Sequence, residues 1–245
     1  MKTLTLAAVL APALALGQGA LAQQMSDAEF GERVRAYLME NPQVIMEAVA
    51  ALEAQEAEAQ AAQDNQLVAD NADALFRAEG DWVGGNPDGD VTVVEFLDYR
   101  CGYCKRAHPE VAELLQSDGN IRLIVKEFPI LGEQSVLASR FAMATLEVAG
   151  NEAYGEVSDA LMTMRGDITA DSLGALADEL ELDGSAIMGA MGTPEIDAKI
   201  AENYALAQTM GISGTPSFVF GDQMVRGYVP LDAMRQIVAE ERDEG

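Results

Sequence analysis

Two runs of apolar residues with a helical segment between them place the strongest constraint on how this chain can fold. The first run covers residues 91–97 (VTVVEFL) and the second covers residues 121–126 (IRLIVK). The segment between them has a helical pattern to about Leu115. A strand, a helix and a second strand in this order form a βαβ unit, whose two strands are parallel. The sequence therefore predicts an α/β fold.

The rest of the compact region is predicted to be mainly helical. Residues 133–210 have helical patterns that are broken at four points, namely Gly150-Asn151, Gly166-Asp167, Asp183-Gly184 and Thr193-Pro194. A short strand at 217–220, a turn and a partner strand at 223–226 follow. We expect a last helix from Pro230 to about Glu240.

The segment 23–80 is predicted to be a helical arm. Ser26 and Glu29 have capping-box spacing, and the pattern restarts at Asn41-Pro42. Residues 53–66 are almost entirely Ala, Gln and Glu, which favour helices but leave little to bury. Such a long helix either bends near Asp64-Asn65 or projects and meets other copies of itself. We predict that it is an arm for homo-oligomerisation, and a helix folded onto its own domain is the alternative.

The first 22 residues have the pattern of a secretory signal peptide. Lys2 precedes an apolar run, and Ala20-Leu21-Ala22 fits the small-residue cleavage rule. The run is too short to span a bilayer well, so a retained anchor is the less favoured alternative. We therefore expect export to the periplasm, and we predict a domain from residue 81 to residue 245 after the arm.

The charge of the chain excludes one class of partner. It has 41 acidic and 15 basic side chains, and its formal net charge is −26 at pH 7. Nucleic acids and anionic membrane surfaces attract basic proteins. We expect neither as a partner, and we interpret the dispersed acidic residues as a solvated surface.

The only two cysteines, Cys101 and Cys104, form a Cys-x-x-Cys motif, and the only histidine, His108, follows it. These three side chains are too few for a structural zinc site, and Lys105 stands where a haem-attachment motif needs histidine. An iron–sulfur cluster requires four ligands. A disulfide across two residues would constrain the unfolded chain little. The pair is therefore predicted to be a redox-active dithiol with no metal and no cofactor other than its own disulfide.

The position of the pair suggests a different task for each thiol. Cys101 directly follows a strand and opens a helix, where backbone N–H groups favour a negative charge. Three basic residues are close to it in sequence: Arg100, Lys105 and Arg106. We expect Cys101 to be the attacking thiolate and Cys104, one turn further on, to be the buried resolving thiol. His108 is interpreted as a partly exposed helix residue without a role in the reaction.

These motifs together resemble the exported DsbA family of thiol-disulfide oxidoreductases. The resemblance rests on Val94-Glu95-Phe96, on Cys101-Gly102-Tyr103-Cys104 and on Gly214-Thr215-Pro216, and it extends over residues 82–241. It implies a thioredoxin fold with an inserted helical domain at about 133–210. It also implies that Pro216 is a cis-proline beside the dithiol and that the Thr215 backbone pairs with substrate peptide. Gly102 and Tyr103 would contact the substrate as well.

The resemblance also implies a charged pair below the dithiol. Glu95 lies six residues before Cys101 in a strand that we expect to be buried, and Lys126 lies near the end of the next strand. A buried carboxylate normally needs a partner. These two residues would form a proton relay in which Glu95 accepts the proton of Cys104, and a solvent-facing Glu95 at a strand edge is the alternative.

The arm resembles the N-terminal segment of the suppressor-of-copper-sensitivity C-type proteins within this family. The match lies between Phe30 and Leu52 and includes the stretch YLMENPQVIMEAVAALE. In those proteins the segment serves oligomerisation, and some members are disulfide isomerases. The resemblance thus implies an enzyme that exchanges disulfides with exported cysteine-containing proteins and is reset by a membrane or periplasmic redox partner. Oxidase and isomerase both remain open, although the uncharged Gly102-Tyr103 pair favours the weaker oxidant.

Two other functions remain as alternatives. The thiolates could bind Cu(I), with help from four methionines of the predicted insert: Met162, Met164, Met188 and Met191. Packing in a core explains methionines equally well. The protein could also be a chaperone-like holder whose cysteines are incidental.

Overall fold

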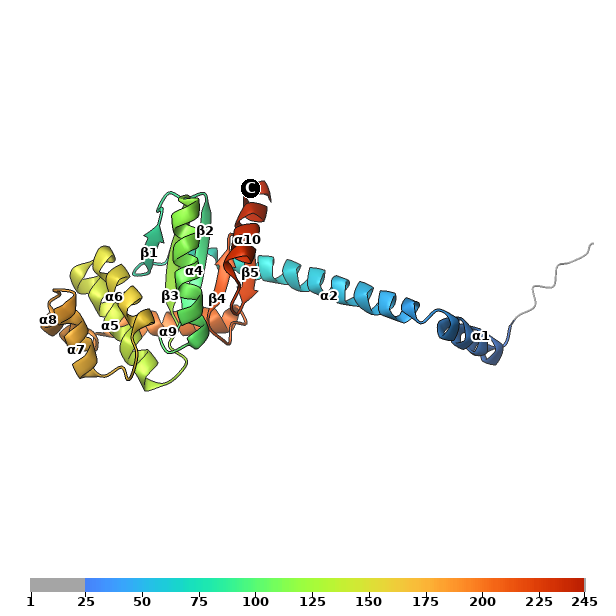
Figure 1. Cartoon of the computed structure of the whole chain (residues 1–245), viewed down its shortest axis with the longest axis horizontal. Coiled ribbons are helices and arrows are strands. Elements are labelled where there is room, and N and C mark those ends of the chain that lie inside the picture. The colour runs from blue at the N-terminus through green and yellow to red at the C-terminus, as the bar shows by residue number, and fades with distance from the viewer. Residues whose placement is uncertain (1–24, 245) are drawn as a thin grey trace, which may run out of the picture. The chain divides into compact units, whose positions relative to one another are not determined.

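The computed structural model describes residues 25–244, so the predicted signal peptide lies outside the described residues. Contacts divide the chain into two units at Ala54 and Gln55, and each unit is described by itself. None of the described helices is long and apolar enough to cross a membrane. Figure 1 shows the elements, which are α1 (Asp27–Glu40), α2 (Gln43–Asp70), α3 (Ala72–Phe76), β1 (Trp82–Gly85), β2 (Val91–Leu97), α4 (Gly102–Asp118), β3 (Ile121–Glu127), α5 (Glu133–Ala149), α6 (Asn151–Thr163), α7 (Ala170–Glu179), α8 (Gly184–Ala190), α9 (Pro194–Thr209), β4 (Ser217–Phe220), β5 (Gln223–Arg226) and α10 (Leu231–Glu244).

The N-terminal unit consists of α1 and the first turns of α2. The capping box at the start of α1 is present, because the Ser26 hydroxyl accepts from the Glu29 backbone and the Ser26 backbone donates to the Glu29 carboxylate. No residue of α1 is buried. Large apolar side chains of this unit lie exposed, namely Phe30, Val34, Tyr37, Met39, Ile45, Met46, Val49 and Leu52.

A five-stranded sheet organises the second unit. Its order is β1-β3-β2-β4-β5, so that β2 is the central strand. β2 and β3 are parallel, which confirms the predicted βαβ unit, and the other neighbouring pairs are antiparallel. The mixed sheet and its many helices are those of a thioredoxin fold.

Alternating side chains of β2 and β3 enter two different cores. Val93, Leu97 and Val125 face the side covered by α4 and α10. Val94 and Ile124 face the other side, where α3 and α9 pack. Because successive strand residues point to opposite faces, a shift of one position decides which core a side chain enters.

The compact unit begins earlier than residue 81, where the sequence placed its start. Val68 and Leu75 are buried in the second core, and both belong to the segment that we predicted to be the arm. The helix has no break at Asp64-Asn65, where a bend was one of the two alternatives, because α2 continues to Asp70. Asp64 is instead held by two charge-assisted hydrogen bonds, of 2.7 and 2.8 Å, from the Arg226 guanidinium.

Helices α5 to α9 extend over residues 133–209 and lie between β3 and β4 in sequence. Helices α5 to α8 stand beside the β1 edge of the sheet (Figure 1). Trp82 of β1 stacks on Tyr154 of α6 at 5.2 Å between ring centroids, and its indole donates to the Asn151 carbonyl. The four methionines considered as copper ligands all pack in the first core: Met162, Met164, Met188 and Met191.

Candidate functional site

The two cysteines lie at the start of α4, on the carboxyl end of β2. Cys101 is the N-cap residue of α4, and Cys104 lies in its first turn. Both are free thiols. The side chain of Cys104 is fully buried, whereas Cys101 retains 7% exposure. Only Cys101 is therefore reachable from solvent.

The segment before β4 approaches Cys101 from the neighbouring strand. The Thr215–Pro216 peptide bond is cis. The Cys101 thiol donates to the Thr215 carbonyl, with 3.1 Å between sulfur and oxygen. β4 pairs with β2 so that Ser217 lies opposite Phe96. This register places Thr215 and Pro216 beside the dithiol, although Thr215 lies more than 110 residues after Cys101 in sequence.

The environment of Cys104 keeps its thiol protonated. Burial raises the pKa of Cys104 far above its ordinary value, and the Glu95 carboxylate raises it further. The backbone of Asp98 and the side chain of Thr215 act in the opposite direction by hydrogen bonding to the sulfur. Cys104 consequently needs a proton acceptor before it can attack a disulfide.

Glu95 is the carboxyl group whose charge acts on Cys104, so it is the candidate proton acceptor. It is 3% exposed, in a row with Val93 and Leu97 on the α4 face of the sheet. Burial raises the pKa of Glu95 to about 8, and the charge of Glu127 contributes to the rise. The alternative of a solvent-facing Glu95 is therefore wrong.

The predicted pair of Glu95 and Lys126 is not formed, because the two side chains enter different cores. The register places Glu95 opposite Val125, so Lys126 is one position out of step and points to the other face. Lys126 is 1% exposed and pairs with Asp81. Its ammonium also donates to the Ala74 carbonyl at 2.5 Å. No lysine among the described residues pairs with Glu95.

Two of the three basic residues close to Cys101 in sequence, Arg100 and Lys105, donate to backbone carbonyls near the end of α6. The Lys105 ammonium donates to the Met164 carbonyl at 2.8 Å, and the Arg100 guanidinium donates to the Gly166 carbonyl at 2.8 Å. Lys105 therefore caps the C-terminal end of α6, and Arg100 holds the loop that follows it. His108 lies 2.9 Å from the Asp159 carboxylate and also joins α4 to α6.

The surface next to Cys101 carries two tyrosines. Tyr103 is 61% exposed, and Gly102 beside it is exposed as well. The ring of Tyr103 lies 6.1 Å from the ring of Tyr228, over which the Arg106 guanidinium is centred at 4.5 Å. The Tyr228 hydroxyl donates to Glu110 of α4 at 2.7 Å. Aromatic rings, an arginine and an exposed backbone therefore flank the reachable thiol.

A buried network around Glu127 was missed by sequence reasoning. The carboxylate accepts from the hydroxyls of Tyr99, Tyr154 and Ser139 at 2.7, 2.5 and 2.6 Å. Burial raises the pKa of Glu127 to about 7, although these hydrogen bonds lower it. A glutamate at the end of an apolar strand was the available signal, but its donors come from three other segments, which are the loop after β2, α5 and α6.

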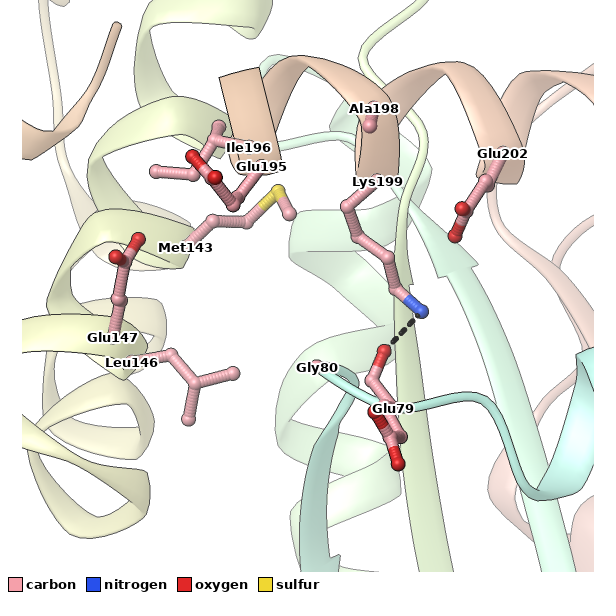
Figure 2. A pocket seen from close by; sticks show the side chains of 10 residues that line it. All are labelled: Glu79, Gly80, Met143, Leu146, Glu147, Glu195, Ile196, Ala198, Lys199 and Glu202. Atoms are coloured by element: carbon pink, nitrogen blue, oxygen red, sulfur yellow. Dashed lines mark hydrogen bonds between the residues drawn. The ribbon is translucent and has the colours of Figure 1, made fainter. Parts of the chain in front are cut away.

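A separate cavity of about 490 Å³ lies between α5, α9 and the segment before β1. Figure 2 shows Met143 and Leu146 among the side chains that line it, and Lys199 pointing toward the Glu79 carbonyl, to which it donates at 2.8 Å. Neither cysteine lines this cavity.

A reachable thiol at a helix N-terminus, a buried second thiol and a cis-proline loop define a thioredoxin-fold protein with a Cys-x-x-Cys site. A family model described as DSBA-like thioredoxin domain matches residues 92–239. The chain belongs to this family. A second model, described as Copper resistance protein ScsC N-terminal domain, matches residues 27–59 and confirms the resemblance of the arm.

Three known proteins illustrate the similarity. A thioredoxin-like oxidoreductase from Silicibacter pomeroyi DSS-3 is 43% identical, with 70% of this chain and 97% of that chain covered and a TM-score of 0.66. Proteus mirabilis ScsC in a transitional conformation is 26% identical, with 91% and 99% covered and a TM-score of 0.67. The Na(+)/H(+) antiporter NhaA 1 of Salinispora arenicola is 30% identical over 159 residues, which are 64% of this chain but only 24% of the antiporter. The chain thus spans about a quarter of that curated relative.

Proposed function

We propose that this protein is an exported thiol-disulfide oxidoreductase or isomerase that exchanges disulfides with client proteins through Cys101 and Cys104. The observation that carries the proposal is the asymmetry of the two thiols. Cys101 is reachable and lies 3.1 Å from the Thr215 carbonyl, whereas Cys104 is fully buried behind it. A thiol that is partly accessible beside a cis-proline, with a second thiol fully buried behind it, suits stepwise attack and resolution in disulfide exchange.

The reaction follows from this arrangement. The Cys101 thiolate attacks one sulfur of a client disulfide, so that a Cys101–client bond forms and the second client sulfur leaves as a thiolate. Two outcomes are then available. In the first, the released client thiolate attacks another disulfide of the client, and a client thiolate then attacks the Cys101–client bond, which forms a new client disulfide and frees the Cys101 thiolate. In the second, Cys104 attacks Cys101 and releases the client in reduced form. Because Cys104 must first lose a tightly held proton, the mixed disulfide has time to rearrange.

The surface beside Cys101 suits an extended peptide. The Thr215 backbone stands at the edge of the site, where it can pair with the client backbone on either side of the attacked cysteine. Gly102 leaves this approach open, and Tyr103 offers an aromatic face for a client side chain. Such contacts are largely independent of client sequence, which fits an enzyme with many exported clients.

Isomerase is the activity that we favour over oxidase. Gly102 and Tyr103 contribute no charge that would stabilise the Cys101 thiolate, and a less stabilised reduced form makes a weaker oxidant. The exposed apolar residues of α1 and early α2 provide a surface on which copies of the chain associate. We place this activity in the periplasm, where a membrane or periplasmic redox partner would return the dithiol to its working state.

The variant Cys104→Ser should trap the proposed intermediate. The serine cannot displace the client, so a disulfide-bonded client accumulates on Cys101 after incubation with a cysteine-containing exported protein. Non-reducing electrophoresis and intact mass measure the adduct, which a reductant should remove. The matched double variant with Cys101→Ser as well should form none. An equal yield of adduct from both variants would refute Cys101 as the nucleophile.

Deletion of residues 23–54 should produce a monomer that retains insulin reduction but loses most of its scrambled-ribonuclease refolding. The deletion ends at 54 because Asp64, Val68 and Leu75 belong to the compact unit. Light scattering measures the mass, and Val49→Glu on the exposed apolar surface should act in the same direction. Gln55→Glu is the polar control and should change neither quantity. A full-length protein that is already monomeric would contradict the oligomeric arm.

A further inference from the structure

Two buried carboxyl groups lie on the same face of the sheet below the dithiol. The register places Leu97 beside Glu127, so Glu95 and Glu127 are diagonal neighbours on adjacent strands. Strand spacing and rise put such neighbours roughly 8 Å apart between their Cα atoms. The two side chains are 3% exposed each. At this separation in a buried site, ionisation of one group opposes ionisation of the other.

The two groups differ in what surrounds them. Glu127 accepts three hydrogen bonds from hydroxyls, at 2.5 to 2.7 Å, and such donors stabilise a carboxylate. Glu95 has no hydrogen-bonding or ion-pairing partner within residues 25–244, and its strand neighbours are Val125 and Phe218. Glu127 therefore ionises first, and its negative charge then holds a proton on Glu95.

The polar groups that face this pair come from α4, from the loop after β2 and from the helical insert. The thiols of Cys101 and Cys104 approach from α4, and the Lys126 ammonium lies on the opposite face of the sheet. Asp98 acts on Glu127, but its carboxylate is held by the backbone of Ile130 and Leu131 and by Ser135. The remaining neighbours are neutral hydroxyls, namely Tyr99, Ser139, Tyr154 and Ser158. Asp81 and Lys199 line a small cavity together with Glu127, but Lys199 pairs with Asp81, and neither Glu95 nor Glu127 forms an ion pair within residues 25–244.

We propose that Glu127 is a positioning residue of the dithiol, which ionises before Glu95 and thereby keeps on Glu95 the proton that Glu95 exchanges with Cys104. The inference rests on the proposed function and extends it to the timing of client release. Two of the three donors to Glu127, Ser139 and Tyr154, come from the helical insert. The insert therefore acts on the dithiol through Glu127.

The proton balance shows how this controls release. When Cys104 resolves the mixed disulfide, its S–H proton passes to the Glu95 carboxylate. The Cys101–Cys104 bond forms, the Cys101–client bond breaks, and the client sulfur leaves as a thiolate. A protonated Glu95 cannot accept that proton, so resolution is slow until Glu95 ionises. In the reverse direction, a client thiolate attacks Cys101, and Cys104 leaves and takes the proton from Glu95.

The two steps can be separated with Ellman's reagent, a small aromatic disulfide, and the reduced full-length protein in stopped flow. The first release of the coloured thiol reports the attack by Cys101, and the second reports resolution by Cys104. The rate of the second release should rise with pH through an inflection near 8, where Glu95 ionises. In Glu127→Gln this inflection should move down by roughly one pH unit. The second release should then be about fivefold faster at pH 7, with the first release unchanged.

Three variants complete the test. Glu95→Gln should remove the inflection, and Ser139→Ala should move it down by less than Glu127→Gln because one donor to Glu127 is lost. Glu113→Gln changes an exposed charge of α4 and should leave the profile in place. If Glu127→Gln does not fold, Ser139→Ala decides. An inflection that stays in place or moves up in a folded variant would overturn the role of Glu127. The proposed function would instead be overturned if the unsubstituted protein gave neither release, or if Cys101→Ser still gave both.

Discussion

The Cys101→Ser variant should fold normally and lose catalysed insulin reduction and scrambled-ribonuclease refolding completely, down to the uncatalysed rate. A serine hydroxyl does not attack a disulfide under conditions in which a thiolate does. Cys104 cannot replace it, because it is fully buried and its pKa is strongly raised. Turbidity of reduced insulin and recovery of ribonuclease activity measure the two losses.

The Cys101→Ser substitution should remove the reactive thiol without lowering the stability of the fold. Cys101 is the N-cap residue of α4 with extended backbone angles and makes no side-chain capping bond. Serine is among the preferred residues at this position, so the variant should be as stable as the parent or slightly more stable. Thermal unfolding checks this point. Cys104→Ser is the companion variant, which should still react once with a client disulfide. Full activity of folded Cys101→Ser would remove the dithiol from the mechanism.

The sheet shows what apolar patterns can and cannot predict. The strands around the dithiol were predictable because β2 and β3 are continuous apolar runs, and a helix between them leaves a parallel pair. β1 was missed because Trp82–Gly85 is four residues long and half of it is glycine, which disfavours strands. Its place is fixed by pairing with β3 and by the stacking of Trp82 on Tyr154, neither of which is a local property.

The arm was predicted too long for a related reason. Helix propensity is uniform from residue 53 onward and does not reveal where a helix meets a sheet. Val68 and Leu75 are the contacts that decide it, together with the distant partner Arg226 of Asp64. The structure is needed to show that Val68 of α2 is buried in the second core, while the apolar residues near the start of α2, such as Val49 and Leu52, are exposed.

The site was predictable where its signal is local. The Cys-x-x-Cys motif, the position of Cys101 at the start of a helix and the burial of Glu95 all follow from short patterns. The charged pair of Glu95 with Lys126 was wrong because strand register, which the sequence does not contain, sends Lys126 to the other face. The charge that does influence Glu95 comes from Glu127, which directly follows Lys126 in sequence.

The position of Lys126 leads to the second large effect, which concerns stability. The substitution Asp81→Asn should lower the free energy of unfolding by about 3 to 5 kcal/mol. The Asp81 side chain is buried between two ammonium groups, and it pairs with Lys126 and lies 2.8 Å from Lys199. Without the carboxylate, Lys126 loses its ion pair and keeps only neutral acceptors there, which are the Ala74 carbonyl and the amide oxygen of the new asparagine. Urea unfolding at pH 7 measures the loss.

The pH dependence distinguishes a lost counter-charge from a lost packing contact. Burial lowers the pKa of Lys126, and Asp81 opposes that effect, so the asparagine should lower it further. Between this folded value and the unfolded value of about 10.4, the unfolded chain binds more protons. The free energy of unfolding of the variant should therefore recover as the pH rises from 7 toward 10.

Asp73→Asn is the matched control, because Asp73 forms an exposed ion pair with Arg77. It should change the free energy of unfolding by less than about 1 kcal/mol and show no recovery at alkaline pH. A deficit in Asp81→Asn that is the same at pH 7 and at pH 10 would contradict the counter-charge explanation and assign the loss to packing. Because Lys126 and Glu95 enter different cores, Asp81→Asn should also leave the second release with Ellman's reagent unchanged.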